Sequence, residues 1–306
     1  MLTLAGLGPR RLHRLPRGVE PEPYHRFSVT PLSPTIGAEI EGVDLSRPLD
    51  PDLLADVRRA LLEWKVIFFR DQHLERDAHA AFARHWGELE NHPFFGHVEH
   101  TPGQPDDTPE VVRFAKGDAA KGYENIWHND VTWRETPALG AVLRAVDLPA
   151  TGGDTLWADM AVAYDNLPRE VRDAIDALDA EHDWVHSFGL AMDAEQRDNL
   201  RKAFPPVVHP VVIAHPETGR RTLYVNRIFT TRIVGMPEDE SDELLALLCD
   251  QAAVPEYQCR FHWTPGAVAF WDNLATQHYA TSDYFPATRV MERVSIVGTR
   301  PVRGTT

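Results

Sequence analysis

The fold class is decided by the stretch Ala267-Val268-Ala269-Phe270-Trp271-Asp272-Asn273. Its apolar and aromatic run is typical of a buried β-strand, and the polar residues that end it begin a turn. The same strand-like character recurs along the chain, in the segments 110–114, 126–133, 140–147, 182–186, 207–214, 222–226, 257–262, 267–272 and 290–298. Many strands joined by long connections predict a closed or double-sheet β core.

Helices are expected around this core. Asp50 suits a helix N-cap, Pro51 suits the first helical position, and leucines follow at helical spacing. The expected helices begin at residue 51 and cover about 75–87, one or two stretches within 156–178, and about 238–252; shorter strands are expected at 27–30, 36–43 and 66–69. No βαβ period recurs, which argues against a doubly wound parallel sheet. The predicted fold is mainly β with bracing helices.

The domain organisation follows from the change in pattern near residue 27. Residues 1–26 mix Pro, Arg and Gly without a period and are expected to form a mobile arm. Residues 27–306 contain no internal repeat and no clear linker, so they are expected to form one domain.

Composition excludes several classes of protein. The 306 residues are 43% hydrophobic, which is enough for a packed core. Their net charge of −15 gives no overall positive field that would attract nucleic acid or an anionic membrane. No apolar run is long enough to span a membrane, and the first residues lack a signal-peptide core. The two cysteines, Cys249 and Cys259, are expected to be reduced, which fits a cytoplasmic protein.

A candidate metal site combines two distant segments. In an extended strand, His128 and Asp130 of Trp127-His128-Asn129-Asp130 would share one face. His278 follows the strand 267–272 and a polar turn, about 150 residues further along, where a β core can bring it back against the first pair. Two imidazoles and one carboxylate suit non-haem Fe(II) and leave coordination positions open, whereas a structural zinc site favours a fourth protein ligand.

Two arginines form a further pattern. In a strand, Arg289 and Arg293 would point to the same side, together with Met291 and Ser295. Buried guanidiniums need carboxylates or other anions as partners, which favours an anion-binding role. The alternative is an edge strand with solvated arginines paired to Glu292 or to other surface acids.

These segments together resemble the taurine dioxygenase (TauD/TfdA) family of Fe(II)/2-oxoglutarate-dependent dioxygenases. The similarity runs from about residue 28 to 301 and is carried by the segments 127–130, 152–157, 229–234, 271–273, 276–279 and by the two arginines. The resemblance implies a double-stranded β-helix, or jelly roll. It also implies Fe(II), 2-oxoglutarate and O₂ as cofactors and co-substrates, and assembly into dimers or tetramers.

The resemblance also implies roles for individual residues. The metal ligands would be His128, Asp130 and His278, and Thr155 and Arg289 would hold the distal carboxylate of 2-oxoglutarate. A sulfonate substrate would meet His92, the backbone of Val131 and Arg293, and Phe188 and Phe229 would line its pocket unless they are ordinary core residues. Hydroxylation of the carbon next to sulfur, in taurine or a related sulfonate, would release sulfite and an aldehyde, with succinate and CO₂ as co-products.

Two departures from the family pattern concern the substrate. Phe95 stands where taurine enzymes carry a tyrosine, which removes one hydroxyl contact. Glu124 stands where a neutral amide is expected, and within the pocket it could pair with a substrate ammonium.

Three alternatives stay open at this point. The same chemistry could act on an alkyl sulfate, an aryloxyalkanoate or a carboxylated metabolite. The chain could instead be a cupin-like metal-binding protein without oxygenase activity, although Thr155 and the second arginine would then have no function. The basic arm at the N-terminus could bind nucleic acid.

Overall fold

The computed structural model describes residues 8–91, 108–118 and 124–304. Its largest sheet has the strand order β1-β2-β3-β14-β6-β16-β4, and β5 also pairs with β16. These strands are β1 (Ser28–Pro31), β2 (Ala38–Glu41), β3 (Val66–Phe69), β4 (Leu89–Glu90), β5 (Val111–Lys116), β6 (Ala138–Asp147), β14 (Val268–Asp272) and β16 (Arg289–Val297). The pairings are antiparallel except that between β2 and β3.

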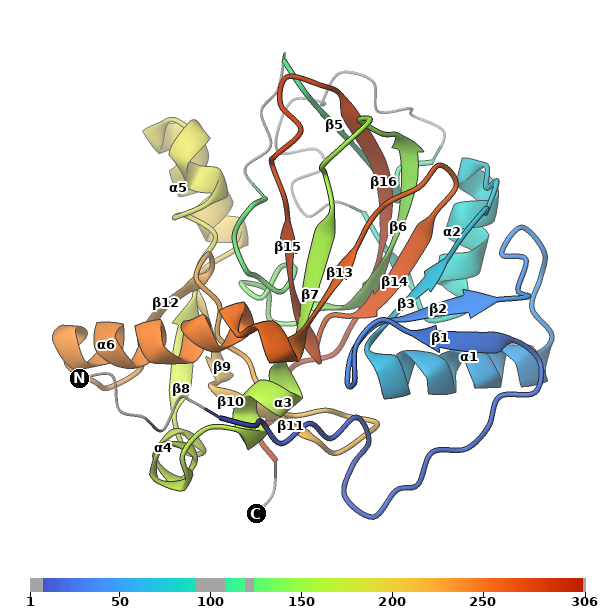
Figure 1. Ribbon diagram of the computed structural model, residues 1–306. Helices are drawn as coiled ribbons and strands as arrows, with labels where there is room; N and C mark the ends of the chain where they lie inside the picture. Colours follow the sequence, from blue (N-terminus) through green and yellow to red (C-terminus); the bar gives the residue numbers. More distant parts are fainter. Residues whose placement is uncertain (1–7, 92–107, 119–123, 305–306) are drawn as a thin grey trace.

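A smaller sheet faces the large one (Figure 1). It consists of β13 (Gln258–Phe261), β7 (Thr155–Asp159) and β15 (Thr276–Ala280). The rings of Phe68 from the large sheet and Phe261 from the small one stack with centroids 4.0 Å apart, and Trp157 packs edge-on against Phe68. Aromatic side chains from both sheets therefore fill the space between them, and the predicted double-sheet β core is confirmed.

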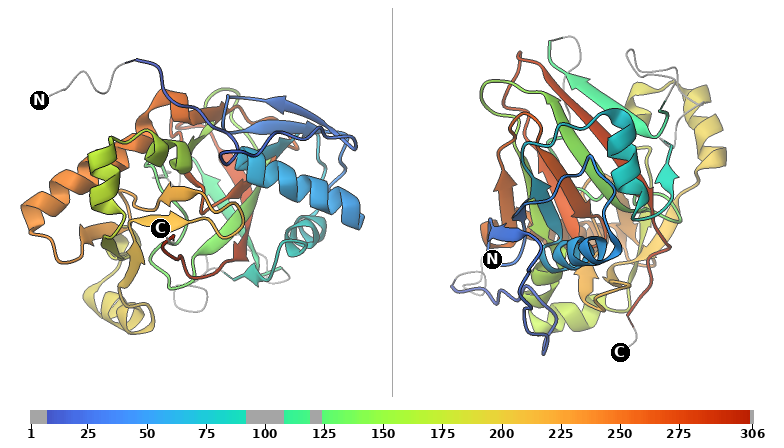
Figure 2. Two further views of the ribbon diagram at one scale, coloured as in Figure 1. Left: turned by 90° about the horizontal axis from the view of Figure 1, so that it is seen from below. Right: turned by 90° about the vertical axis from the view of Figure 1, so that its right-hand side faces the viewer.

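The helices α1 (Pro51–Trp64) and α2 (Arg76–Arg84) cover the outer face of the large sheet (Figure 2). In β3, Phe68 packs in the cluster between the two sheets, whereas Ile67 and Phe69 belong to the core cluster that includes residues of these helices. Because β3 is buried on both faces, it reads as a continuous apolar run, as predicted for 66–69. The helix α1 begins as predicted, with the Asp50 carboxylate accepting from the backbone N–H groups of Asp52 and Leu53.

A second layer of short elements extends from the small sheet. It contains β8 (Asp179–His182), β9 (Val207–Pro210), β10 (Val212–Ala214), β11 (Arg221–Leu223), β12 (Thr230–Ile233), α3 (Met160–Asp165), α4 (Arg169–Ile175), α5 (Ala194–Ala203), α6 (Glu238–Cys249) and the 3₁₀ turns η2 (Phe188–Ala191), η3 (Asp250–Ala253) and η4 (Pro255–Tyr257). The turn of residues 215–220 joins β10 to β11.

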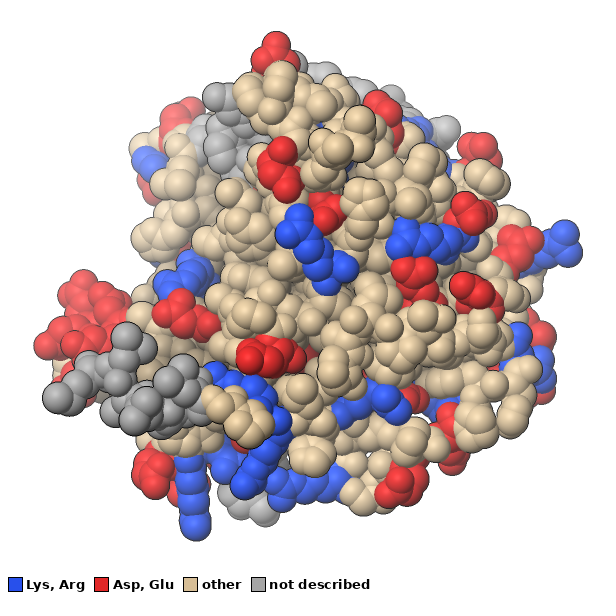
Figure 3. All heavy atoms as spheres, viewed as in Figure 1, with Lys and Arg blue, Asp and Glu red and all other residues tan. Residues whose placement is uncertain are grey.

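Most of the expected helices of this layer are present. The one or two helices expected within 156–178 are confirmed as α3 and α4, and strand β7 precedes them. The helix α5 was not predicted. The helix near 238–252 is confirmed as α6, and Figure 3 shows acidic side chains gathered over its first turn, which contains Glu238, Asp239 and Glu240. Acidic groups at this end stabilise a helix through its dipole.

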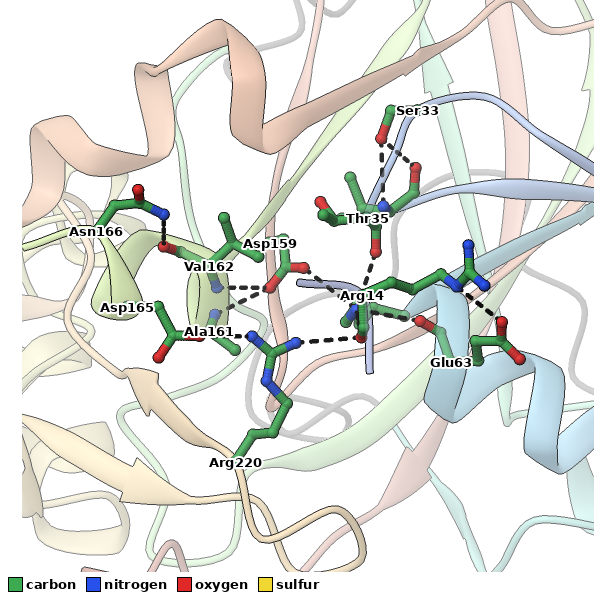
Figure 4. A network of polar contacts seen from close by, with 12 residues as sticks. Arg14, Ser33, Thr35, Glu63, Asp159, Ala161, Val162, Asp165, Asn166 and Arg220 are labelled. Atoms are coloured by element: carbon green, nitrogen blue, oxygen red, sulfur yellow. Dashed lines mark hydrogen bonds and ion pairs between the residues drawn. The ribbon is translucent and has the colours of Figure 1, made fainter. Parts of the chain in front are cut away.

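Residues 8–26 lie against the body of the protein in irregular structure. The buried Lys65 ammonium donates to the Arg14 carbonyl oxygen at 2.7 Å and lies 3.2 Å from Asp159 Oδ2. The Arg14 side chain is 2.7 Å from Glu63 Oε1, and Figure 4 shows it at the centre of this network. Arg14 thus binds Glu63 of α1 and Lys65, which follows that helix; the mobility predicted for residues 1–26 stays a prediction.

None of the helices within the described residues is long and apolar enough to cross a membrane.

Candidate active site

Two histidines that are far apart in sequence lie side by side. His128 and His278 form an antiparallel bridge in which each backbone N–H donates to the other residue's carbonyl, at 3.1 and 2.8 Å. One ligand atom from each of them and one from Asp130 all lie within 4.8 Å of one another. The structure therefore brings together the three side chains that were predicted to form a metal site.

The local geometry differs from the prediction, because 126–133 is not a strand. Only His128 pairs in the manner of a strand, and the chain then turns through Val131, whose φ of 47° is left-handed. The alternation of side chains along a strand therefore does not explain why Asp130 faces the histidines. The turn and its hydrogen bonds do.

Two buried asparagines hold this turn. Asn273 Oδ1 accepts from the Asp130 N–H at 2.7 Å, and its Nδ2 donates at 3.0 Å to the carbonyls of Asp130 and Ala138. Asn129 Nδ2 donates to the carbonyls of Asn273 and Thr276, at 2.9 and 2.7 Å. No role was predicted from the sequence for either asparagine. A polar amide next to the end of a buried strand was the available signal, because a buried amide needs hydrogen-bond partners.

The protonation states suit metal binding. His128 Nδ1 lies 2.7 Å from the Ile126 carbonyl oxygen, so this nitrogen donates a hydrogen bond to it and Nε2 is the nitrogen that can face a metal. Burial, together with the neighbouring His128, lowers the pKa of His278 to about 3, so this imidazole is neutral. Burial acts to raise the pKa of Asp130, but Arg293 and the two histidines outweigh it and the pKa is lowered.

The donor set fits a ferrous ion. Asp130 Oδ2 is buried, lies 4.0 Å from His278 Nε2 and has no hydrogen-bond partner among the described residues. A buried oxygen of a charged carboxylate without a partner is costly unless a cation completes its environment. Two imidazoles and one carboxylate are the donors that non-haem Fe(II) takes, and among the described residues the group contains these three.

A small cavity of about 80 Å³ is lined by His278 and by Thr155 and Arg289, the two residues predicted to bind the keto acid. Thr155 Oγ1 accepts from Arg289 Nη2 at 3.3 Å and from Trp263 Nε1 at 3.0 Å. Burial lowers the pKa of Arg289, yet the group stays charged at neutral pH, and its Nε has no partner among the described residues. A buried guanidinium in this state needs an anion. Sequence reasoning missed Trp263.

Gly153 gives Arg289 its room. A Cβ at this position would lie 3.0 Å from Arg289 Cδ, and the glycine has a φ of +73°. Both facts favour glycine here, because other residues rarely adopt this conformation and would crowd the arginine.

The edge-strand alternative for the arginines is wrong. β16 is an inner strand that pairs with both β5 and β6, and Arg289 and Arg293 line cavities on one face. Glu292 points to the other face, where it is buried and binds Arg76, Arg113 and Arg144. The acid next to the two arginines in sequence is therefore not their partner.

A larger cavity of about 840 Å³ is lined by His128 and Asp130 of the triad. Five of the residues predicted to bind the substrate line this cavity, namely Glu124, Val131, Phe188, Phe229 and Arg293. The other two, His92 and Phe95, lie outside the described residues. Its apolar lining consists of Val112, Phe114, Ile126, Val131, Trp133, Phe188, Leu190, Ile228 and Phe229. Phe229 also belongs to a buried apolar cluster, so it packs in the core as well as lining the cavity.

Arg293 joins the cavity to the triad. Its Nη1 lies 2.7 Å from Asp130 Oδ1, and its Nε is buried without a partner among the described residues. Another cation of the wall, Lys116, was missed by sequence reasoning; its Nζ lies 3.0 Å from Glu124 Oε1.

Residues 28–295 match the family model described as taurine catabolism dioxygenase TauD, TfdA family. The chain belongs to this family. An alpha-ketoglutarate-dependent sulfate ester dioxygenase of Pseudomonas putida is 38% identical over 285 residues, which are 90% of this chain and 91% of that protein. An alkylsulfatase of Acinetobacter baylyi is 36% identical, over 90% of this chain and 86% of that protein.

A solved structure described as a taurine dioxygenase from Burkholderia xenovorans is similar in fold, with a TM-score of 0.78 and 38% identity, over 92% of this chain and 95% of that one. The jelly-roll prediction is confirmed. This TauD-family protein is a 2-oxoglutarate-dependent dioxygenase that works with Fe(II), 2-oxoglutarate and O₂, and the alternative of a metal-binding protein without oxygenase activity is wrong.

Proposed function

We propose that this dioxygenase hydroxylates the carbon that carries the sulfur-containing anionic head of an alkyl sulfate or alkyl sulfonate with an apolar tail. The observation that carries the proposal is the cavity of about 840 Å³, mostly apolar in its lining, with Arg293 at its contact with the triad. A sulfate or sulfonate head would bind the arginine, and the tail would occupy the apolar part.

In this proposal His128, Asp130 and His278 hold Fe(II), while Arg289 and Thr155 hold the distal carboxylate of 2-oxoglutarate. The iron, with the keto acid and O₂, supplies the oxidising power that inserts oxygen into a C–H bond and forms succinate and CO₂. The protein's own contribution is placement, since a C–H bond held beside the metal reacts far faster than a freely diffusing one.

Arg293 has donors for two partners. Its Nη1 binds Asp130, and the guanidinium carries further N–H donors with which a second anion can pair. An anionic head held there would lie next to the triad, so the carbon attached to the head would be the nearest to the metal.

Taurine is the substrate that the family resemblance suggests first, but the described wall favours an uncharged tail. Taurine is a small zwitterion, and its ammonium would have to find its counter-charge in Glu124, which already binds Lys116. An apolar tail instead matches the nine apolar side chains of the lining. Phe188 and Leu190, 39% and 78% exposed, mark the side of the cavity where a longer tail would reach solvent.

The buried reduced cysteines Cys249 and Cys259 fit a reaction in the cytoplasm, which we include in the proposal.

Product analysis tests the proposal. The enzyme with Fe(II), 2-oxoglutarate and ascorbate would be given n-hexyl sulfate, n-hexanesulfonate, taurine and an aryloxyalkanoate, and succinate would be measured for each. An oxidised alkyl sulfate releases sulfate and an aldehyde, whereas a sulfonate releases sulfite and an aldehyde. We expect the hexyl compounds to exceed taurine in kcat/KM; a preference for taurine or for the aryloxyalkanoate would refute the proposal.

A further inference from the structure

The charged side chains on the wall of the larger cavity occur as ion pairs. Arg293 binds Asp130 at 2.7 Å, Lys116 Nζ lies 3.0 Å from Glu124 Oε1, and Glu90 binds Arg134. The Arg293–Asp130 pair belongs to the triad and to the proposed site of the anionic head, and in the Glu90–Arg134 pair the arginine is not itself part of the lining. The Lys116–Glu124 pair has neither feature.

Lys116 occupies a defined place on the wall. It is the last residue of β5 and lies opposite Arg289 in the register with β16. Residues opposite each other in an antiparallel pair point to the same face, so Lys116 faces the interior together with Phe114 and Arg289. Lys116 and Glu124 line both cavities, which places the pair where the keto-acid and substrate compartments meet.

We propose that Lys116 is a specificity-determining residue, which by pairing with Glu124 balances the charge of the substrate cavity and so selects an apolar tail over one that ends in an ammonium. The inference rests on the proposed function, because it concerns the tail of the same substrate. It also explains why an acid can stand where taurine enzymes are expected to have an amide.

The physical reason is the change in charge. The side chains of Lys116 and Glu124 are 25% and 41% exposed, so their fields are partly screened but still reach into a cavity with apolar walls. An ammonium on the tail would be repelled by Lys116 and would compete with it for Glu124. Removal of the lysine charge would make the wall more negative by one unit, which favours a cationic tail.

The test compares two ligands that differ only at the end of the tail: n-hexyl sulfate and its counterpart with a terminal ammonium. Their affinities would be measured by calorimetry for the enzyme with Fe(II) and 2-oxoglutarate in the absence of O₂, for the wild type, Lys116→Met, Lys116→Arg and the double variant Lys116→Met with Glu124→Gln. Lys202→Met, on the exposed face of α5, is the matched control for loss of a lysine.

We expect Lys116→Met to shift the ratio of affinities by about tenfold toward the ammonium-tailed ligand, a size typical of one partly screened charge. Lys116→Arg, Lys202→Met and the double variant should keep the wild-type ratio within about twofold. The affinity for 2-oxoglutarate should stay unchanged in Lys116→Met, since Arg289 and Thr155 remain in place.

Different results overturn different statements. If n-hexyl sulfate binds the wild type but the ratio is unchanged in Lys116→Met, the inference fails and the proposed function stands. If Lys116→Met instead weakens 2-oxoglutarate binding with an unchanged ratio, the lysine belongs to the keto-acid compartment and the inference is wrong. If neither ligand binds the wild type, the proposed function fails and the inference falls with it.

Discussion

Asn273→Ala should damage the metal site and the fold together, and the size of the effect follows from its hydrogen bonds. The side chain is fully buried and makes three hydrogen bonds, two with the backbone of Asp130 and one with the Ala138 carbonyl. At about 1 kcal/mol for each bond, the variant should lose about 3 kcal/mol of unfolding free energy. The loss leaves the buried Asp130 N–H without an acceptor.

The effect on the metal is separate from the loss of stability. Asp130 lies in a turn, next to Val131 with its left-handed φ, and Asn273 bonds both the N–H and the carbonyl of Asp130. Groups that orient metal ligands typically contribute about 10–100-fold to metal affinity. We therefore expect Fe(II) binding to weaken by that factor in the folded variant.

Urea denaturation would measure the stability, and anaerobic titration with Fe(II) under conditions where the variant is folded would measure the affinity. Asn199→Ala on α5 is the matched control and should change neither quantity. Loss of stability with an unchanged Fe(II) affinity would refute the reasoning, because the turn would then keep Asp130 in place without the amide.

The other predictions concern the arginines, a glycine and a buried acid. Arg293→Ala should raise the KM of the sulfate or sulfonate by about 10–100-fold and leave that of 2-oxoglutarate nearly unchanged, and Arg289→Ala should do the reverse; steady-state kinetics in both substrates would show whether the roles are exchanged. Gly153→Ala should weaken 2-oxoglutarate binding and lower the unfolding free energy by about 1–2 kcal/mol, because the position has a positive φ and the new Cβ would lie 3.0 Å from Arg289 Cδ. A wild-type affinity for 2-oxoglutarate together with a wild-type unfolding free energy would contradict this explanation. Burial acts to raise the pKa of Glu292, but Arg76, Arg144 and Arg113 together lower it from an ordinary 4.5 to about 2. The charged Glu292 therefore stabilises the fold above pH 4.5, and this contribution to the unfolding free energy is lost as the pH falls toward 2. Glu292→Gln should thus be less stable than the wild type by about 3 kcal/mol at pH 7, with a gap that narrows below pH 4.5 in urea denaturation; a gap independent of pH would exclude this cause.

The sequence predicted best where one physical signal dominated. Strand β3 is buried on both faces, and its four apolar residues gave its bounds correctly. The α1 start was equally clear, because Asp50 and Pro51 are chemically suited to their positions. The helix α5 was missed although Asp193 and Gln196 form a capping box, since its mostly polar surface lacks the apolar period on which the prediction relied.

The site shows where sequence reasoning reaches its limit. The prediction named the triad correctly but placed 126–133 in a strand, because alternation is the simplest way for His128 and Asp130 to share a face. The actual geometry depends on Asn129 and Asn273, which are about 144 residues apart, and no local pattern shows that they meet. No local pattern shows the partners of Glu292 either, because its three arginines come from three other elements.

The arrangement of the strands separates the chemistry from the choice of substrate. His278 lies on β15, Thr155 on β7 and Arg289 on β16, and these residues line the small cavity that we propose for the keto acid. The larger cavity, which we propose for the substrate, is also lined by residues of β5 and of the segment that contains η2, neither of which contributes a residue to the triad. A change at Lys116 or Phe188 can therefore alter which tail fits without moving a metal ligand. This separation gives a physical reason why proteins so similar to this one can be described by different substrates, and why the residues that face the cavity from β5 are the place to look for the difference.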